Sequence, residues 1–548
     1  MNQFSTSAAT AESQTPATID AFDRLTPLGW RWGLAAIIAG LAASFFLFGY
    51  ALIYWHNADM DLVLIYNALA LNDGKPQVFF DHPAYLTILS VEFWYRLLHA
   101  LGLLDAWKLS AIPSAADVPA FDAAMTSAVR AGRLLALLIT AVSVLIFAGL
   151  ARVILRDWRV ALFATLAFAL SGGIAVHSRI LRTELVAACP VIFALMILIA
   201  VGRRASIARP LAMAMAAGLC VLGLENKVQA ILLIGVLPMV TLPFGTAASP
   251  SVAFWRHSRS AWPAAALAAA AAIAAAAAAS PLIATGFDRA LLDAAHFHPL
   301  LLGRFGTYQT ALLLLIGGCM IGFAAIWRIT AAETLASMSA VIAGASIALL
   351  ALELQYDASN VIAVANPLEK MLSFADAATS DIASGSILSA ILPLLGGVAS
   401  VLARYSFVLH SSPRPAVFLI WLIVPGIVAA WRRGERQVAI QSLLLLLAAI
   451  GIDALGVRRG LKSEYFIFTD PLIILSGAIL LDCLCDLRFH KWTYPVAIVL
   501  FGLHLAVGQA EPIKYALMRR GPEPICEWNQ YGLPLLPLPW CSSPPVRP

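Results

Sequence analysis

The chain alternates long apolar runs with short polar turns and two longer polar stretches. A helix needs about 20 apolar residues to cross the hydrocarbon core of a bilayer. On this basis we expect thirteen membrane-spanning helices, over residues 32–54, 131–151, 160–176, 185–202, 210–224, 228–245, 261–284, 309–326, 334–353, 415–431, 437–456, 471–487 and 494–508. The run 386–403 is apolar enough to be another span. Its Gly396-Gly397 pair and amphipathic flank favour equally a helix that lies in the membrane surface.

Composition agrees with this pattern. Of the 548 residues, 61% are hydrophobic and 12% are charged, and the mean hydropathy is +0.84. A soluble domain carries about 25% charged residues, so we expect an all-α polytopic membrane protein. The net charge of +5 is modest and there is no compact basic patch, which argues against a nucleic-acid partner.

Arginines and lysines in the short loops indicate the orientation. They form five clusters, which comprise Arg152, Arg156 and Arg159; Arg203, Arg204 and Arg209; Arg256 and Arg259; Arg432, Arg433 and Arg436; and Arg488 and Lys491. With thirteen spans all five clusters fall on one side, which the positive-inside rule assigns to the cytoplasm. We therefore expect a multi-pass protein of a bacterial inner membrane, with its N-terminus in the cytoplasm and its C-terminus in the periplasm.

Three regions follow from this topology. Residues 1–29 are polar and predict a disordered cytoplasmic segment; no cleavable signal peptide is evident, because the apolar run that follows is long enough to span. Residues 30–508 form the transmembrane domain, with outer loops 55–130 and 354–414, the first of which should contain interfacial helices. Residues 509–548 form a Pro-rich segment outside the cytoplasm.

The end of that segment holds two cysteines. Residues 521–548 include eight prolines, which predicts neither a helix nor a span there. In an oxidising compartment Cys526 and Cys541 could form a disulfide, and two unpaired thiols are the alternative.

Acids and cations gather on the face opposite the arginine clusters. Asp59-Met60-Asp61 follows the first apolar run, and Phe80-Asp81-His82-Pro83 lies further along the same loop. Ionisable groups at the membrane edge are candidates for function. For any single cation, snorkelling or a rim salt bridge is the ordinary explanation. For the whole set an anionic ligand explains more, and the set also includes Arg179, Arg182, Glu184, Glu225, Lys227, His296, His298, Arg304, Arg458, Arg459, Lys462 and Tyr465.

These residue types suit one kind of reaction. Carboxylates can accept a proton from a hydroxyl nucleophile, and Lys, Arg and His can bind a phosphate. A polyprenyl-phosphate sugar presents such a phosphate at the membrane surface. The sequence contains no phosphate-binding P-loop and no convincing dinucleotide-binding glycine motif.

The order of these motifs resembles the GT-C class of glycosyltransferases, in particular the branch that holds the protein O-mannosyltransferases and the transferase of aminoarabinose to lipid A. The matching residues are Asp59, Gly74 and Phe80-Asp81-His82-Pro83; Ser178-Arg179-Ile180-Leu181-Arg182-Thr183-Glu184-Leu185; Gly223-Leu224-Glu225-Asn226-Lys227; and Tyr465 with the apolar span that follows it. They cover the first 245 residues best.

The resemblance implies roles for these residues. Asp59 would be the general base or would orient the acceptor, and Glu184 would be the second acid. Lys227, His82 and Arg182 would hold the donor phosphate, with Arg179, Lys462 and Tyr465 as further candidates for the same site.

The chain also departs from the family pattern. Glu184 stands where the family often has Asp, and Asp59-Met60 where it usually has Asp-Glu. Asp61 could therefore be the base instead, or Asp59 and Asp61 together could bind a divalent cation; we favour a site without a metal. His296 and His298 have the spacing of a metal pair but lack a third ligand.

Each motif residue also has a structural explanation. Asp59 could be a solvated loop acid, His82 could belong to the start of an interfacial helix, Arg182 and Glu184 could be a rim ion pair, and Lys227 could snorkel.

The sequence therefore predicts a membrane glycosyltransferase that moves a sugar from a polyprenyl-phosphate donor to a lipid, glycan or protein acceptor. The first alternative is a lipid-sugar flippase or transporter, although such proteins usually place ionisable groups near the bilayer midplane. The second is a non-catalytic membrane scaffold or an oligosaccharide polymerase of another fold. The sugar, the acceptor and the oligomeric state stay open.

Overall fold

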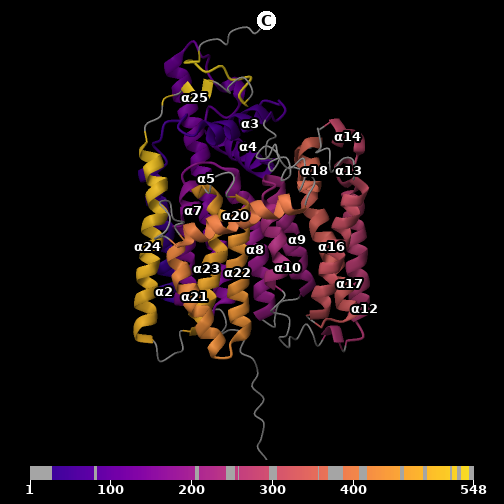
Figure 1. Ribbon diagram of the computed structural model, residues 1–548. Coiled ribbons are helices and arrows are strands. Elements are labelled where there is room, and N and C mark those ends of the chain that lie inside the picture. Colours follow the sequence, from indigo (N-terminus) through magenta and orange to yellow (C-terminus); the bar gives the residue numbers. More distant parts are fainter. Residues whose placement is uncertain are drawn as a thin grey trace, which may run out of the picture.

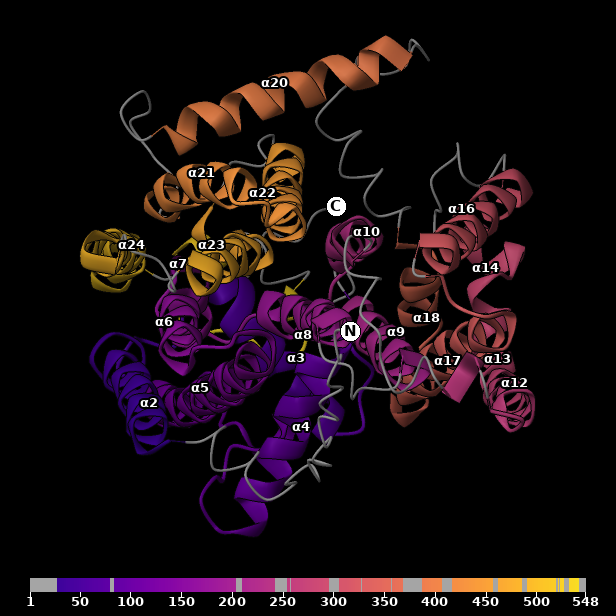
Figure 2. The same ribbon diagram turned by 90° about the horizontal axis from the view of Figure 1, so that it is seen from below.

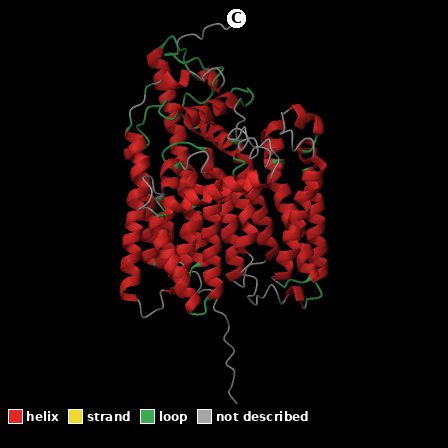
Figure 3. Cartoon of the chain, viewed as in Figure 1, coloured by secondary structure: helices red, strands yellow, loops and turns green. Residues whose placement is uncertain are grey.

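A computed structural model describes most of the chain. The described residues are 27–78, 83–203, 209–241, 254–256, 258–294, 305–326, 328–355, 357–367, 387–406, 416–456, 462–484, 490–518, 521, 523–526 and 532–541. Within these ranges every regular element is a helix, and most helices run side by side in one bundle (Figures 1 and 3). The prediction for residues 1–29 falls almost entirely outside these ranges, and so do His296 and His298.

Each of the thirteen predicted spans coincides with a helix. These helices are α2 (Leu28–Phe48), α5 (Val118–Ile154), α6 (Trp158–Ala169), α8 (Thr183–Arg203), α9 (Arg209–Asn226), α10 (Ala230–Thr241), α12 (Ala261–Ala278), α16 (Phe305–Ile326), α17 (Ala331–Leu349), α21 (Val417–Arg432), α22 (Arg436–Gly456), α23 (Asp470–Leu484) and α24 (His490–Leu517). In the described part of the chain, eight helices are long and apolar enough to cross a membrane. The protein is thus a polytopic helical membrane protein, and thirteen crossings stay a prediction.

Shorter helices lie at one end of the bundle, which we call the outer end. They include α3 (Val63–Asn72) and α4 (Tyr85–Ala100) from the first long loop (Figure 1). The prediction of helices in loop 55–130 is confirmed. The other short helices include α7 (Gly172–His177), α13 (Ser280–Gly286), α14 (Arg289–Ala294), α18 (Ala358–Ala365) and the short helical segments Ala58–Leu62, Leu109–Ala111, Leu350–Gln355 and Ser463–Phe468.

Gly74 has a simple structural role. It follows α3 with a φ of 71° and its amide donates to the carbonyl of Leu71. Glycine adopts this left-handed conformation without steric cost, so Gly74 ends the helix.

The run 386–403 does not cross the bundle. Figure 2 looks along the spans, and α20 (Ile387–Tyr405) is seen there from its side, lying outside α21 and α22 at the edge of the bundle. The structure therefore favours the interfacial helix over the additional span.

The C-terminal region differs from the sequence prediction in two ways. Helix α24 continues to Leu517, although residues from 509 onward were expected in the Pro-rich segment. Glu523–Cys526 forms a single helical turn, α25, so the prediction of no helix in 521–548 is wrong there. Proline is tolerated in the first turn of a helix because its missing N–H has no partner in that turn.

Cys526 and Cys541 form a disulfide, with 5.4 Å between their Cα atoms. The loop that it closes packs on the outer end through Leu533, Leu536 and Leu538, all buried. The segment that contains these leucines is therefore packed against the outer end of the bundle.

Helix α8 is the centre of the bundle. In the most apolar 18-residue stretch of α8, 83% of the residues are buried inside the protein, against 6% in the corresponding stretch of α16. Helix α9 packs against α8 on one side and against α17 on the other, and α12 packs on α17 (Figure 2). A span with this degree of burial can carry polar groups only where they find partners, which directs attention to the ends of α8 and α9.

Candidate functional site

A fully buried carboxylate lies at the outer end of α8. Glu184, in the first turn, accepts hydrogen bonds from Lys227 Nζ (2.8 Å) and Arg182 Nη2 (2.9 Å) at Oε1, and from Arg182 Nε (3.1 Å) at Oε2. Glu184 and Lys227 have no exposed surface and Arg182 is 8% exposed. We call these three residues the outer cluster. Its members come from the motifs 178–185 and 223–227, which are far apart in the sequence.

Asn226 positions the outer cluster. Its side-chain N–H donates to the carbonyl of Thr183, and its side-chain oxygen accepts from the backbone N–H and the hydroxyl of Thr87, both at 2.9 Å. The carbonyl of Asn226 accepts from the amide of Ala84. One side chain thus joins α9, α8 and the start of α4, which places Lys227 directly against Glu184.

A second buried ion pair lies beside it. Arg133 Nε donates to Asp61 Oδ2 (2.7 Å), and the amide of Leu181 donates to Asp61 Oδ1 (2.6 Å). Arg133 also donates to the carbonyls of Leu52 and Ile53. Because both carboxylate oxygens of Asp61 are engaged, this acid holds the segment before α8 in place and is poorly placed to act as the base.

The structure places the remaining predicted residues differently. The ring of Tyr465 lies 5.4 Å from Lys227 Nζ, so it adjoins the outer cluster. The Arg179 guanidinium instead donates to Ser44 and Gln509, and Lys462 is exposed at the start of the turn Ser463–Phe468. Neither cation is brought to Glu184.

Two predicted residues cannot be placed. The backbone of Asp59 lies in the turn Ala58–Leu62, two residues before Asp61, but its side chain is outside the described part of the structure. His82 lies outside it altogether. The roles of both stay predictions.

The sequence interpretation did not select two neighbours of the outer cluster, Glu464 and His177. Glu464 Oε1 lies 3.8 Å from Arg182 Nη2. His177, at the end of α7, interacts electrostatically with Glu184, Arg182 and Lys227, and its Nε2 lies 3.0 Å from the carbonyl of Glu464. Burial lowers the pKa of His177 to about 4, so the ring is neutral at pH 7. His177 directly precedes the Arg-rich motif, and this position was the only signal.

Glu225 belongs to the charged set and to the motif 223–227 that the sequence analysis selected, but it was given no specific role there. It is fully buried one residue before Asn226, and neither of its carboxylate oxygens has a hydrogen-bond partner among the described residues. A buried carboxyl group without a partner is expensive to keep, so the position suggests a role with a ligand.

The described residues contain no group of three or more His, Cys, Asp or Glu that could hold a metal ion. The engagement of both Asp61 oxygens also weakens the alternative of a cation shared by Asp59 and Asp61, since a divalent cation would have to displace Arg133 or the amide of Leu181.

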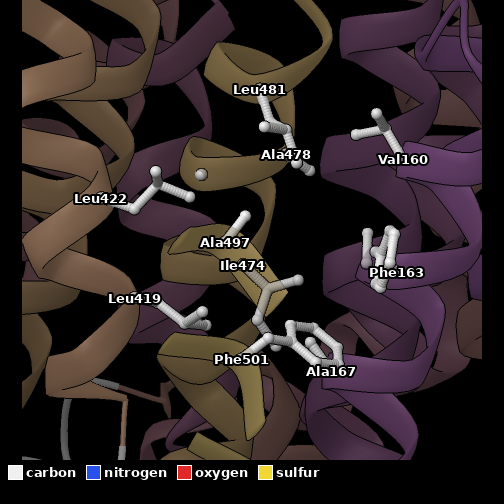
Figure 4. A pocket seen from close by; sticks show the side chains of 12 residues that line it. Val160, Phe163, Ala167, Leu419, Leu422, Ile474, Ala478, Leu481, Ala497 and Phe501 are labelled. Atoms are coloured by element: carbon white, nitrogen blue, oxygen red, sulfur yellow. The ribbon is translucent and has the colours of Figure 1, made fainter. Parts of the chain in front are cut away.

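An apolar cavity lies away from these charges. It is enclosed by α6, α21, α23 and α24 and lined by side chains such as Phe163, Leu419, Ile474 and Phe501 (Figure 4). Its volume of about 40 Å³ is far below the ~300 Å³ of a small ligand pocket. No polar side chain enters it, so it is not the reaction site.

Comparisons with family models, with curated proteins and with solved structures gave no match. The functional interpretation therefore depends on the chemistry of the outer cluster.

Proposed function

We propose that the protein is a membrane glycosyltransferase that moves a sugar from a polyprenyl-phosphate donor to an acceptor at the outer end of the bundle. The observation that carries the proposal is the contact of Glu184 with both Lys227 and Arg182 in a fully buried position. These residues were expected to act together on the basis of separate motifs.

The charges of the outer cluster suit a lipid-linked phosphate. Lys227 and Arg182 carry two positive charges and Glu184 one negative charge, so the three together attract an anion. Glu464 balances that excess only partly, because it lies 3.8 Å from Arg182 and is 17% exposed. A phosphate oxygen that replaced Glu464 would form charge-assisted hydrogen bonds with Arg182 and Lys227. As the sugar left, the phosphate would gain negative charge, which the same cations would stabilise.

Glu184 would keep both cations in place before the donor arrives. Such pre-organisation lowers the cost of binding because the side chains are already ordered. Asp59 would take the proton of the acceptor hydroxyl, and its backbone position beside Asp61 connects it to the segment before Glu184.

The reaction can be identified in a deletion strain of the source organism. Mass spectrometry of its envelope lipids and glycans should show the loss of one sugar from one acceptor, which names donor and acceptor together. Accumulation of an untransported lipid-linked sugar, with unchanged enzyme activity in broken membranes, would instead favour a flippase.

Replacement of Asp59 tests the general base in the same strain. Asp59→Asn should fail to restore the modification while the protein accumulates normally, because the amide cannot accept the proton. The matched control is Asp73→Asn, which removes an acid at the end of α3 and should restore the modification. Full restoration by Asp59→Asn would remove Asp59 from this role.

Replacement of Lys227 tests the phosphate site. Lys227→Ala should weaken binding of the donor, once identified, by tenfold or more, since a charge-assisted hydrogen bond is worth about 1.5–3 kcal/mol. Turnover of bound donor should change less. Lys108→Ala removes an outer-end cation far from the outer cluster in sequence and should leave donor affinity unchanged; an equal affinity in Lys227→Ala would contradict the assignment.

A further inference from the structure

A polar cavity of about 630 Å³ opens at the outer end, on α5 and beside the C-terminal end of α4. Its polar lining comes from Asp122, Thr126, Ser127 and Arg130 of α5, and its apolar lining includes Leu104 and Leu134. None of these residues belongs to the outer cluster, so the cavity is a separate feature that the proposed reaction does not explain.

Arg130 is the notable group in this cavity. Its guanidinium lies 5.2 Å from the centre of the Tyr50 ring, and its Nε is buried without a hydrogen-bond partner among the described residues. No described acid lies within ion-pair distance of it; Asp122, on the same wall, accepts instead from the hydroxyl of Tyr54 (2.7 Å). The positive-inside rule disfavours a cation at this end, and an anion that enters the cavity would satisfy it.

The length of α5 places Arg130 at a particular depth. At about 1.5 Å per residue, Arg130 lies about 36 Å along the axis from Ile154, the inner end of the helix. The hydrocarbon core is about 30 Å thick, and the headgroups bring the total to about 40–45 Å. With Ile154 taken as the inner boundary of the hydrocarbon core and α5 as perpendicular to the membrane, Arg130 falls in the outer layer of lipid phosphates. Asp122, about 48 Å from Ile154 by the same measure, lies above that layer.

The surface inward of the cavity is apolar and exposed. Leu134 lines the cavity one turn below Arg130, and Leu138 (48% exposed) and Val142 (46%) continue at the same i, i+4 spacing. Residues at this spacing share one face of a helix. This face would contact lipid chains, and it leads directly to Arg130.

We propose that the cavity binds one phosphate-bearing membrane lipid. The phosphate would accept hydrogen bonds from Arg130, with Ser127 and Thr126 as further donors. The acyl chains would follow Leu134, Leu138 and Val142, and a hydroxyl or ammonium of the headgroup would reach Asp122. A free phosphate ion would use Arg130 but not the apolar face. The exposed side chains of Leu138 and Val142 therefore favour a lipid over a phosphate ion.

The test uses the purified full-length protein in a mild detergent. Dioleoyl phosphatidylglycerol, dioleoylglycerol and inorganic phosphate would be titrated separately, with apparent Tm and native mass spectrometry as readouts. We expect saturable binding of the phospholipid, and much weaker binding of the other two. Equal protection by dioleoylglycerol, or by inorganic phosphate alone, would overturn the proposal.

Substitution then locates the site. Arg130→Met should weaken phospholipid binding about tenfold or more, and Arg130→Lys, which keeps the charge, should weaken it less. Lys108→Met removes a cation of the same outer layer that lies beside Trp107 and outside the cavity, and it should bind as the unaltered protein does. Unchanged binding in Arg130→Met, or an equal loss in Lys108→Met, would contradict the assignment. If Arg130→Met does not fold, Arg130→Lys with unaltered affinity would contradict it as well.

Discussion

Helix α9 has a buried ion pair at each end, and the two ends differ in their surroundings. At the inner end Arg209 Nη1 lies 3.2 Å from Glu333 Oε1 of α17. The amide of Glu333 in turn donates to the hydroxyl of Thr330, a helix N-cap. At the outer end Lys227 meets Glu184, which also binds Arg182, beside a carboxyl group of Glu225 without a described partner.

The difference indicates which pair is structural. Thr330 and Glu333 have the spacing of a capping box, which is a common way to begin a helix. The capping motif explains why an acid stands at position 333. Arg209 then forms an ion pair with its carboxylate where α9 packs on α17. The outer cluster has no such local explanation, because it joins two cations and one carboxylate from two chain segments, and Glu464 from a third segment lies beside it. Burial of an ion pair alone is therefore weak evidence for function. The polar groups that surround the pair are more informative.

Removal of each acid should give the largest contrast. Glu184→Gln leaves Lys227 buried without its carboxylate, and we expect a loss of about 3–5 kcal/mol in stability and at least about a hundredfold loss of transfer in the folded protein. Glu333→Gln should cost a similar stability but keep the transfer activity. The measurements are apparent Tm and the amount of modified acceptor per folded protein. Equal loss of transfer in both variants would erase the distinction between the two ends.

Two glycines allow a gentler test of the same contrast. A Cβ at Gly223 would lie 2.7 Å from the carbonyl oxygen of Ala187, and one at Gly344 would lie 2.0 Å from that of Ala214. Gly223→Ala should therefore push α9 from α8 within a turn of the outer cluster, and Gly344→Ala should push α17 from α9 at Ala214, in the inner half of α9. Overpacking of this kind costs about 1–3 kcal/mol.

We expect Gly344→Ala to lower the apparent Tm at least as much as Gly223→Ala, because its closest contacts are all with backbone atoms. Transfer should nevertheless fall mainly in Gly223→Ala, since Lys227 and Glu184 would separate. A greater loss of transfer in Gly344→Ala would show that α9 acts as one rigid unit and that the outer end is not special.

The smallest expected effect concerns pH and His177. Burial holds the pKa of His177 at about 4, below its usual 6.5. Between pH 4 and pH 6.5 the folded protein therefore binds fewer protons than the unfolded protein. Stability from the neutral ring is therefore present above pH 6.5 and is lost as pH falls toward 4, by up to about 1.4 kcal/mol per pH unit. His177→Gln should lose this component, so its apparent Tm should fall less between pH 7 and pH 5 than that of the unaltered protein. Parallel pH profiles would mean that His177 is charged in the folded state or exposed to water.

Some parts of the site could be predicted from the sequence and others could not. The motifs 178–185 and 223–227 were selected because their order resembles the GT-C class and because their charged residues share one predicted face, and the structure does bring Glu184, Arg182 and Lys227 together. Arg179 belongs to the same motif, yet its side chain points toward Ser44 and Gln509. Residues three apart in an irregular turn have no fixed relation, so no pattern distinguishes Arg179 from Arg182.

The amino-acid sequence by itself predicted the helical fold class and where the long apolar helices lie along the chain, because apolar length sets what a bilayer accepts. It also predicted helices in the first loop, but it left open whether Cys526 and Cys541 are bonded or free, which the structure decides in favour of a disulfide. Tertiary structure alone decided which acid has both oxygens engaged and which buried groups lack a described partner. Arg133 reaches Asp61 and not Glu184, whereas Arg130 shares a cavity with Asp122 without pairing with it, because Asp122 accepts from Tyr54 instead. The physical reason is that a charge in a low-dielectric interior responds to neighbours within a few ångströms, and those neighbours come from segments that only folding brings together.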